Sequence, residues 1–222
     1  MDFISIFDVI GPNMIGPSSS HTAGAVSIAL LTRKLFPHNI TKVSFTLYGS
    51  FSKTYHGHGT DKALLGGTLG FATDDVRIRK AFEIAVENGL EYEFIIDEKT
   101  KTKHPNTVDI VLESDDGFKQ SVRGESIGGG KVRIVRINQI DVDFTGEYST
   151  LIVEQMDKPG TVAHITQCLS DQNVNIAFMR LFREDKGATA YTVVESDEKI
   201  PESILEEIKK NPHVHELMLI QI

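Results

Sequence analysis

The amino-acid sequence predicts an α+β fold in which a ferredoxin-like unit follows a larger mixed domain. Residues 148–222 contain six expected elements in the order βαββαβ, which is the order of the ferredoxin-like split βαβ unit. Residues 1–146 instead mix apolar helical stretches with alternating strand patterns. The chain has 222 residues, 40% of them hydrophobic and 24% charged, which is enough to bury a core. The sequence therefore predicts two domains, 1–146 and 148–222.

The first domain begins with an apolar segment at 4–10 and a loop punctuated by glycine and proline. A helix is expected over Ala23–Phe36, because Pro37 stops the apolar stretch there. Alternating apolar residues predict a strand over 41–48. The remaining expected elements are helical stretches at 62–69 and 74–87 and strands at 92–96, 108–113, 119–123 and 132–137. The pattern does not give the order of these strands in a sheet.

The second domain is expected to begin with a strand over 148–155, followed by a turn at Asp157-Lys158-Pro159-Gly160. Proline fixes φ in such a turn and glycine admits positive φ. Apolar periodicity then predicts the remaining elements, which are a helix at 162–169, strands at 174–182 and 188–194, a helix opening at Ile200 and a strand at 214–222.

The charge pattern excludes some classes of function. The 23 basic and 31 acidic residues give a net charge of −8, and no basic run is present, so nucleic-acid binding is not expected. No apolar run reaches about 18 residues, so no transmembrane helix is expected. The N-terminus has no basic region before an apolar stretch, so no signal peptide is visible. We therefore expect a cytoplasmic protein.

A single cysteine, Cys168, limits the redox and metal chemistry of the chain. One thiol excludes an internal disulfide and a thiolate metal cage within the chain. It also excludes this chain as the sole holder of an iron–sulfur cluster, which normally needs three or four thiolates. Cys168 lies in the first expected helix of the second domain, where a small buried hydrophobe is its expected role.

The segment from Gly16 to Thr22, Gly-Pro-Ser-Ser-Ser-His-Thr, opens an apolar helix. One serine there is explained by helix capping, but three serines, His21 and a threonine exceed what a cap needs. Hydroxyls and free backbone N–H groups at a helix N-terminus favour a carboxylate. The segment is therefore a candidate anion site, with His21 as an acid or base.

The segment from His56 to Asp61, His-Gly-His-Gly-Thr-Asp, is a second candidate. The glycines on either side of His58 allow close approach of the backbone to a ligand. Thr60 or Asp61 is expected to cap the following helix, and Gly66-Gly67 to let that helix pack tightly. A zinc site is disfavoured because no His-Glu-x-x-His motif is present.

A glycine triplet, Gly128-Gly129-Gly130, precedes a β-rich run. It predicts a bulge or a close approach of the backbone to another chain. It does not fit the dinucleotide-binding pattern, since it lacks the required spacing and no helix follows.

Residues 148–222 resemble the ACT domain, a small amino-acid-sensing module, in their βαββαβ order and in the Asp-Lys-Pro-Gly turn. The resemblance implies regulatory ligand contacts at Asp157, Gly160, Asn173 and Asn175, the last two at the start of the second strand. The alternative is a dimerising ferredoxin-like unit that binds no ligand.

The three motifs of residues 1–146, from Gly16 to Thr22, Gly57 to Asp61 and Ser126 to Gly130, resemble the β part of the iron–sulfur-dependent L-serine dehydratases. The resemblance covers essentially the whole chain. It implies conversion of L-serine to pyruvate and ammonia, with a [4Fe–4S] cluster on the cysteines of a separate α subunit and no metal ligand from this chain. The first domain also resembles the allosteric substrate-binding domain of some phosphoglycerate dehydrogenases.

Roles for the motif residues follow. His58 is the first choice for the general base, because its flanking glycines give close access, and His21 is the second choice, as base or as a carboxylate and hydroxyl contact. The expected substrate contacts are Ser18, Ser19, Ser20, Thr22, Gly59, Thr60 and Asp61. Asp61 either orients an imidazole or caps its helix, and capping is favoured.

Two classes of function follow from the sequence. The first is a catalytic β chain that binds L-serine, works with an α subunit and self-associates through the ACT domain. The second is a non-catalytic regulatory protein that joins a serine-binding domain to an ACT sensor. The two histidines favour the first, because a sensor has no need of an acid–base pair.

Overall fold

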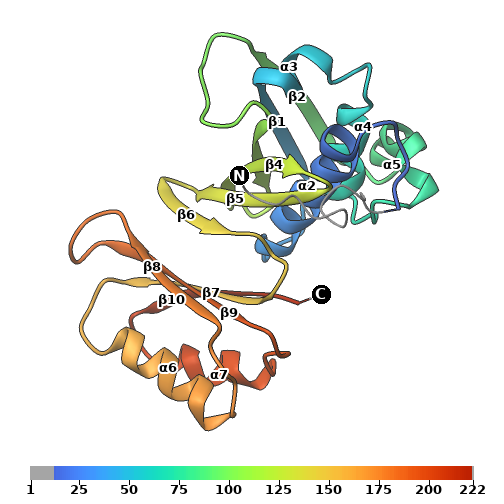
Figure 1. The fold of residues 1–222 in the computed structure, drawn as a ribbon. Helices are drawn as coiled ribbons and strands as arrows, with labels where there is room; N and C mark the ends of the chain where they lie inside the picture. The colour runs from blue at the N-terminus through green and yellow to red at the C-terminus, as the bar shows by residue number, and fades with distance from the viewer. Residues whose placement is uncertain (1–12, 222) are drawn as a thin grey trace, which may run out of the picture. The chain divides into compact units, whose positions relative to one another are not determined.

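The computed structural model describes residues 13–221, so the apolar segment expected at 4–10 lies outside the described residues. The chain divides after Asn138 into two compact units (Figure 1). Both contain helices and strands, as expected for an α+β fold. None of the helices within residues 13–221 is long and apolar enough to cross a membrane.

The sheet of the first unit runs in the order β2-β1-β3-β4-β5. Its strands are β1 (Lys42–Tyr48), β2 (Glu91–Asp97), β3 (Thr107–Glu113), β4 (Lys119–Gly128) and β5 (Lys131–Ile137). Only the pair β1–β2 is parallel among these pairings. A parallel pair needs a long crossover, and the chain between β1 and β2 supplies it with the helices that carry the site. These are α3 (Gly49–Thr54), α4 (Thr60–Thr68), η2 (Val76–Lys80) and α5 (Ala81–Glu87).

The helix expected over Ala23–Phe36 is found as α2 (Gly24–Leu35), preceded by a π-helical turn, η1 (Ser19–Ala23). In this turn the backbone N–H of Ala23 donates to the carbonyl of Ser18, five residues back. The helical stretch expected at 74–87 divides into the 3₁₀ helix η2 and the α-helix α5. Helix α3 was not expected, because its six residues show no apolar period.

Helices α2 and α4 pack closely because Gly67 has no side chain. A Cβ atom at Gly67 would lie 2.5 Å from the carbonyl oxygen of Val26 and 2.7 Å from the Cβ of Ala29. The tight packing expected at Gly66-Gly67 is thus confirmed. It holds the N-terminal end of α4 beside the start of α2, where the two motifs lie.

The glycine triplet 128–130 forms the hairpin turn between β4 and β5, and all three glycines have positive φ. The strand register shifts between Ser126 and Gly128, so the predicted bulge is confirmed. The register shift and the turn give these glycines a role within this chain.

The second unit contains β6 (Ile140–Phe144), which was not expected, and the six elements of the βαββαβ order. These are β7 (Ser149–Met156), α6 (Thr161–Asp171), β8 (Phe178–Arg183), β9 (Thr189–Ser196), α7 (Ser203–Lys209) and β10 (Val214–Ile220). Their sheet runs in the order β10-β7-β9-β8, and all its pairings are antiparallel. Helices α6 and α7 lie together on one face of this sheet (Figure 1).

Strand β8, the second strand of the βαββαβ order, begins four residues later than expected. The strand expected from Val174 starts at Phe178, so the start predicted from the apolar run was wrong. Val174 and Ile176 instead pack from the preceding loop against the core formed by the sheet and the two helices. Asn173 turns the chain there with a φ of 55°.

Candidate active site on the first unit

The loop that opens α2 folds onto the loop that carries His58. Thr22 is buried, and its hydroxyl donates a hydrogen bond of 3.0 Å to the backbone carbonyl of His58. Gly16 has a φ of 144°, and a Cβ atom there would lie 2.7 Å from the Thr22 Oγ1 atom. A side chain at Gly16 would therefore displace Thr22. The serine-rich segment and the histidine–glycine segment are thus joined by one partly buried hydrogen bond.

This contact brings the two predicted histidines together. The rings of His21 and His58 meet edge to face, with 4.8 Å between their centroids. The Nδ1 atom of His21 lies 3.0 Å from the hydroxyl of Ser20, and its Nε2 atom lies 2.9 Å from the hydroxyl of Ser50 on α3. Both nitrogens of His21 are therefore hydrogen-bonded to hydroxyl groups.

Burial lowers the pKa of His21 below its ordinary value, and the nearby His58 lowers it further. A neutral imidazole donates from one nitrogen and accepts at the other, which suits two hydroxyl neighbours. His21 is accordingly a neutral, hydrogen-bonded ring near pH 7 rather than a fixed positive charge.

His58 differs from His21 in its hydrogen bonding. Its Nδ1 atom is buried and has no hydrogen-bond partner among the described residues. A buried polar atom without a partner is costly, and such atoms in native proteins call for an explanation such as a catalytic role or a bound molecule. The Oγ1 atom of Thr60, the next residue but one, is also buried without a partner in the described part of the chain.

The third motif lies beside the first, because Ser126 on β4 is close to the start of α2. A Cβ atom at Gly24, the first residue of α2, would lie 2.8 Å from the Cβ of Ser126. The backbone N–H of Ser126 donates to the carbonyl of Asn106 over 2.9 Å. Within residues 13–221, the Oγ atom of Ser126 and the Oδ1 atom of Asn106 are buried without a partner. The structure thus brings all three sequence motifs together.

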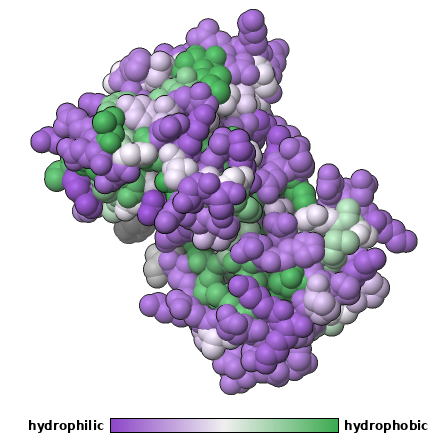
Figure 2. Space-filling model, turned by 180° about the vertical axis from the view of Figure 1, so that it is seen from behind, coloured by the Kyte–Doolittle hydropathy of each residue, from purple (hydrophilic) through white to green (hydrophobic). Residues whose placement is uncertain are grey.

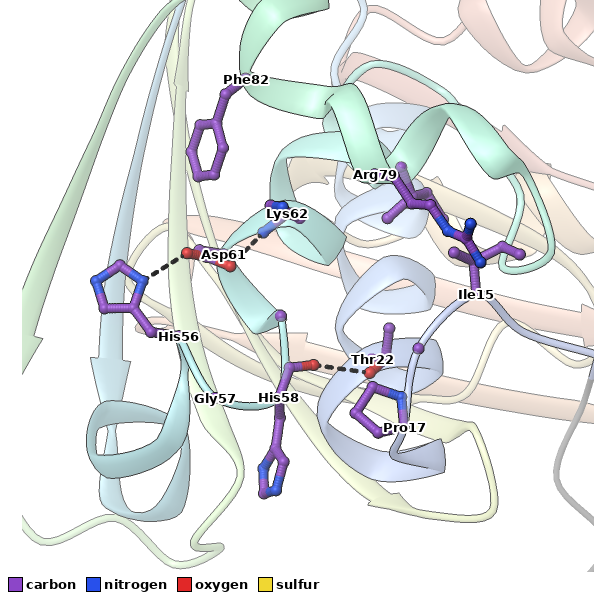
Figure 3. A pocket seen from close by; sticks show the side chains of 13 residues that line it. Ile15, Pro17, Thr22, His56, Gly57, His58, Asp61, Lys62, Arg79 and Phe82 are labelled. Carbon is purple, nitrogen blue, oxygen red and sulfur yellow. Dashed lines mark hydrogen bonds and ion pairs between the residues drawn. The ribbon is translucent and has the colours of Figure 1, made fainter.

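A cavity of about 580 Å³ lies beside the His58 loop (Figure 3). Its wall includes the cationic side chains of Lys62 and Arg79 and the apolar side chains of Ile15 and Phe82. In Figure 3 the imidazole of His58 points away from Lys62 and Arg79. The loop therefore separates this cationic cavity from the side on which the His58 ring meets His21.

Asp61 does not cap helix α4, so the role favoured from the sequence was wrong. The N-cap of α4 is Gly59, in the left-handed region, and no side chain caps it. The Oδ2 atom of Asp61 instead lies 2.8 Å from Nδ1 of His56, and its Oδ1 atom accepts the backbone N–H of Lys62. Asp61 thus takes the other role considered, that of orienting an imidazole, but the ring is that of His56.

The predicted substrate contacts differ in accessibility. Ser18, Ser19 and Ser20 are half-buried, and Ser18 accepts the backbone N–H of His21 at the N-cap. Thr22, Thr60 and Asp61 are almost fully buried. The three serines are therefore better placed than the buried residues to meet a ligand that enters from solvent.

Several residues at the site were missed by motif reasoning. Ser50 lies on the unexpected helix α3, and Asn106 lies in a loop. Lys62 and Arg79 are ordinary charged residues in sequence. Nothing in the local pattern marks these residues, and only the tertiary fold brings Ser50 to His21, Asn106 to Ser126 and Arg79 to the cavity beside the His58 loop.

The donor set of this chain does not fit an iron–sulfur cluster or a zinc ion. Among residues 13–221, no three His, Cys, Asp or Glu side chains converge where they could hold a metal. Cys168 is buried on α6, where burial, followed by nearby acidic groups, raises the pKa of its thiol. The Sγ atom of Cys168 lies 3.7 Å from Nε2 of His164, and a single protonated thiol is a poor metal ligand.

The predicted regulatory residues lie at the two ends of α6. Asp157 and Gly160 precede the helix, whereas Asn173 and Asn175 follow it. Eleven residues of helix span about 16 Å. The carboxylate of Asp157 accepts the N–H of Gly187, which lowers its pKa, and pairs with Arg183. The two pairs of predicted residues are therefore separated in the chain by the whole length of α6.

The pKa of His21 can be checked directly. We expect its imidazole to titrate below the ordinary pKa of 6.5, because burial disfavours the charged form. Since the unfolded chain binds this proton more readily, the contribution of His21 to stability is present above pH 6.5 and is lost as the pH falls below it. NMR titration of the ring signals in the isolated chain measures the midpoint.

In the His58→Gln variant the pKa of His21 should rise but stay below 6.5, since burial is the larger cause. A wild-type midpoint at or above 6.5, or no change in the variant, would contradict this description of the pair.

Comparison with known proteins agrees with the two units. The family model described as "Serine dehydratase beta chain" matches residues 5–136, and that of the ACT domain matches residues 149–213. The chain is 41% identical over 214 residues to the "Probable L-serine dehydratase, beta chain" of Bacillus subtilis, covering 96% of each chain. It is 42% identical over 200 residues to the "L-serine dehydratase, beta chain" of Peptoniphilus asaccharolyticus, covering 90% of each.

A more distant relative is "D-3-phosphoglycerate dehydrogenase" of Methanocaldococcus jannaschii, which is 29% identical over 123 residues. That match covers 55% of this chain and 23% of the relative. The extent of the beta-chain matches decides the assignment: this chain belongs to the serine dehydratase beta-chain family and carries an ACT domain at its C-terminal end.

Proposed function

We propose that this chain is the β subunit of an L-serine dehydratase and that, with an α subunit, it converts L-serine to pyruvate and ammonia. The observation that carries the proposal is the edge-to-face pair of His21 and His58, 4.8 Å apart and beside a cluster of hydroxyls. The beta-chain names of the relatives support the same assignment.

The cofactor is part of this proposal. The resemblance to iron–sulfur-dependent enzymes implies a [4Fe–4S] cluster, and one buried cysteine does not fit its ligation. We therefore assign the cluster to the cysteines of the α subunit. The steps assigned to this chain are proton transfer and substrate positioning.

The base removes the α-proton of serine as the β-hydroxyl leaves as hydroxide, a departure for which the cluster of the α subunit would supply the Lewis acid. An imidazole works well as a general base near neutral pH. His58 is the better choice, because its buried Nδ1 has no partner in residues 13–221, whereas both nitrogens of His21 are occupied by hydroxyls. His21, with its lowered pKa, stays neutral and does not oppose a positive charge on His58. The aminoacrylate product then tautomerises and hydrolyses without further groups.

The serines hold the substrate in this proposal. The half-buried hydroxyls of Ser18, Ser19 and Ser20, at the start of the π-helical turn, bind the carboxylate or amino group of serine. The hydroxyl of Thr22 has a different task, because it donates to the carbonyl of His58. Thr22 fixes the base rather than the substrate.

Reconstitution tests the proposed function. The isolated chain should be colourless and inactive, and mixing with its α partner without oxygen should give a brown complex that forms pyruvate from L-serine. In that complex His58→Ala should lower kcat by about two orders of magnitude or more, as expected for the loss of a general base. His215→Ala, at an exposed histidine of the second unit, is the control.

Activity of the isolated chain, or iron bound to it in stoichiometric amount, would contradict the division of labour between the subunits. Wild-type turnover in both His58→Ala and His21→Ala would favour the second candidate, a regulatory serine-binding protein with an ACT sensor. We keep that candidate because the chain also matches a protein named D-3-phosphoglycerate dehydrogenase, and that name does not describe a dehydratase.

We further propose that two β subunits meet through the ACT domain. Most of the surface seen in Figure 2 is hydrophilic, with hydrophobic side chains gathered in a few patches. Strand β8 is an edge of its sheet, and Phe178 and Leu181 on it are each 46% exposed. An exposed apolar edge strand is a template for pairing with a second chain. Such pairing would also allow one serine molecule to meet both ends of α6, from two different copies.

Sedimentation tests this interface. Leu181→Lys should reduce the assembly of the β chain by one association step, because lysine disfavours edge pairing. Ile95→Lys is a matched control, since Ile95 is also 46% exposed and lies on β2, an edge strand of the other unit. Equal sedimentation of Leu181→Lys and the wild type would refute the β8 interface.

A further inference from the structure

Five residues, 55–59, turn the chain from α3 into α4 and carry His58. Two of the backbone hydrogen bonds in this turn run from the N–H of His58 to the carbonyl of Thr54, over 3.1 Å, and from the N–H of Thr60 to the carbonyl of Tyr55, over 2.8 Å. Two of the five residues are glycines without side chains to hold the turn, and α4 begins without a side-chain cap. A third backbone hydrogen bond runs from the N–H of Gly59 to the carbonyl of His56 over 3.2 Å, so backbone bonds and contacts of the neighbouring side chains determine the position of His58.

A side-chain hydrogen bond closes this loop. The Nδ1 atom of His56 lies 2.8 Å from the Oδ2 atom of Asp61, the second residue of α4. Only 7% of the Asp61 side chain is exposed, whereas 74% of the His56 side chain is exposed. A surface histidine thus donates to a buried carboxylate, and the bond spans the loop from one side of His58 to the other.

Removal of this donor would leave one oxygen of a buried carboxylate without its charge-assisted hydrogen bond. Such bonds are stronger than neutral ones, and a buried carboxylate that loses its partner is strongly disfavoured. The remaining hydrogen bond of Asp61, from the backbone N–H of Lys62, is made within α4 and does not hold the loop.

We propose that His56 is a positioning residue, whose hydrogen bond to Asp61 fixes the loop and so orients the imidazole of His58 toward His21. Figure 3 shows the His56 ring directed to Asp61 and the His58 ring on a different side of the loop. The second attachment of the loop is the bond from Thr22 to the carbonyl of His58. The effect on catalysis rests on the proposed function, whereas the effect on loop geometry does not.

The His56–Asp61 hydrogen bond does not require a charged imidazole. A carboxylate can only accept, so the Nδ1 of His56 carries a proton in both the neutral and the cationic ring. His56 would therefore hold the loop with either form of its ring.

Two substitutions separate positioning from proton transfer. The amide nitrogen of His56→Asn lies close to the position of Nδ1 and can donate to Asp61, but it cannot titrate. His56→Ala removes the donor. In the complex with the α subunit, His56→Ala should lower kcat about ten- to a hundredfold with a much smaller change in KM, the scale for a misplaced catalytic group. His56→Asn should retain most of the activity, with an unchanged pH profile.

His38 supplies a matched control. Its Nδ1 atom lies 2.9 Å from a carboxylate oxygen of Asp116, in a His–Asp pair of the same unit, and its ring stacks on Phe118. His38→Ala breaks a pair of the same chemistry that does not span the His58 loop, so kcat should stay at the wild-type value. An equal loss in His38→Ala would mean that the His56 effect is one of general stability.

NMR of the isolated chain tests the geometry without any activity. Contacts between the ring protons of His21 and His58 should be lost in His56→Ala and kept in His56→Asn. An inactive wild-type complex would contradict the proposed function and leave this measurement valid. Ring contacts preserved in His56→Ala would overturn the positioning role. A loss of kcat in His56→Asn as large as in His56→Ala would also overturn it, because His56 would then act in proton transfer itself.

Discussion

One partly buried hydrogen bond, from the Thr22 hydroxyl to the backbone carbonyl of His58, joins the two segments that carry the site. Thr22 belongs to the π-helical turn before α2, and His58 belongs to the loop before α4. The two segments lie 36 residues apart in the chain, so the local structure of neither one places the other. Their contact sets the distance between the rings of His21 and His58, on which the proposed chemistry depends.

The surrounding fold keeps this contact in place. Gly67 lets α4 lie against α2, so the two helices that follow the segments are fixed relative to each other. The backbone N–H of Ser50 donates to the carbonyl of Pro105 over 2.7 Å, which fixes the start of α3 and with it the hydroxyl that meets His21. The site is therefore built from helix ends that are held by helix packing and backbone hydrogen bonds.

Much of this architecture could be predicted from local pattern. Apolar alternation predicts strands in both units, and the element order predicts the ACT domain. The neighbouring glycines and serines mark the motif histidines. Ser50 could not be found, because a six-residue helix has no readable period. The role of Asp61 was predicted wrongly, because an acidic residue at the start of a helix is as typical of a helix cap as of a partner for an imidazole. Val174 was expected in a strand, but it lies in a loop and packs from there against the core.

The central claim is that the Thr22 hydroxyl holds the two imidazoles together, and Thr22→Val tests it most directly. Valine keeps the branched shape of threonine but cannot donate to the His58 carbonyl, whereas Thr22→Ser keeps the donor. In Thr22→Val the NMR contacts between the His21 and His58 rings should disappear and kcat of the complex should fall, and Thr22→Ser should preserve both. Unchanged ring contacts and unchanged kcat in Thr22→Val would contradict the account.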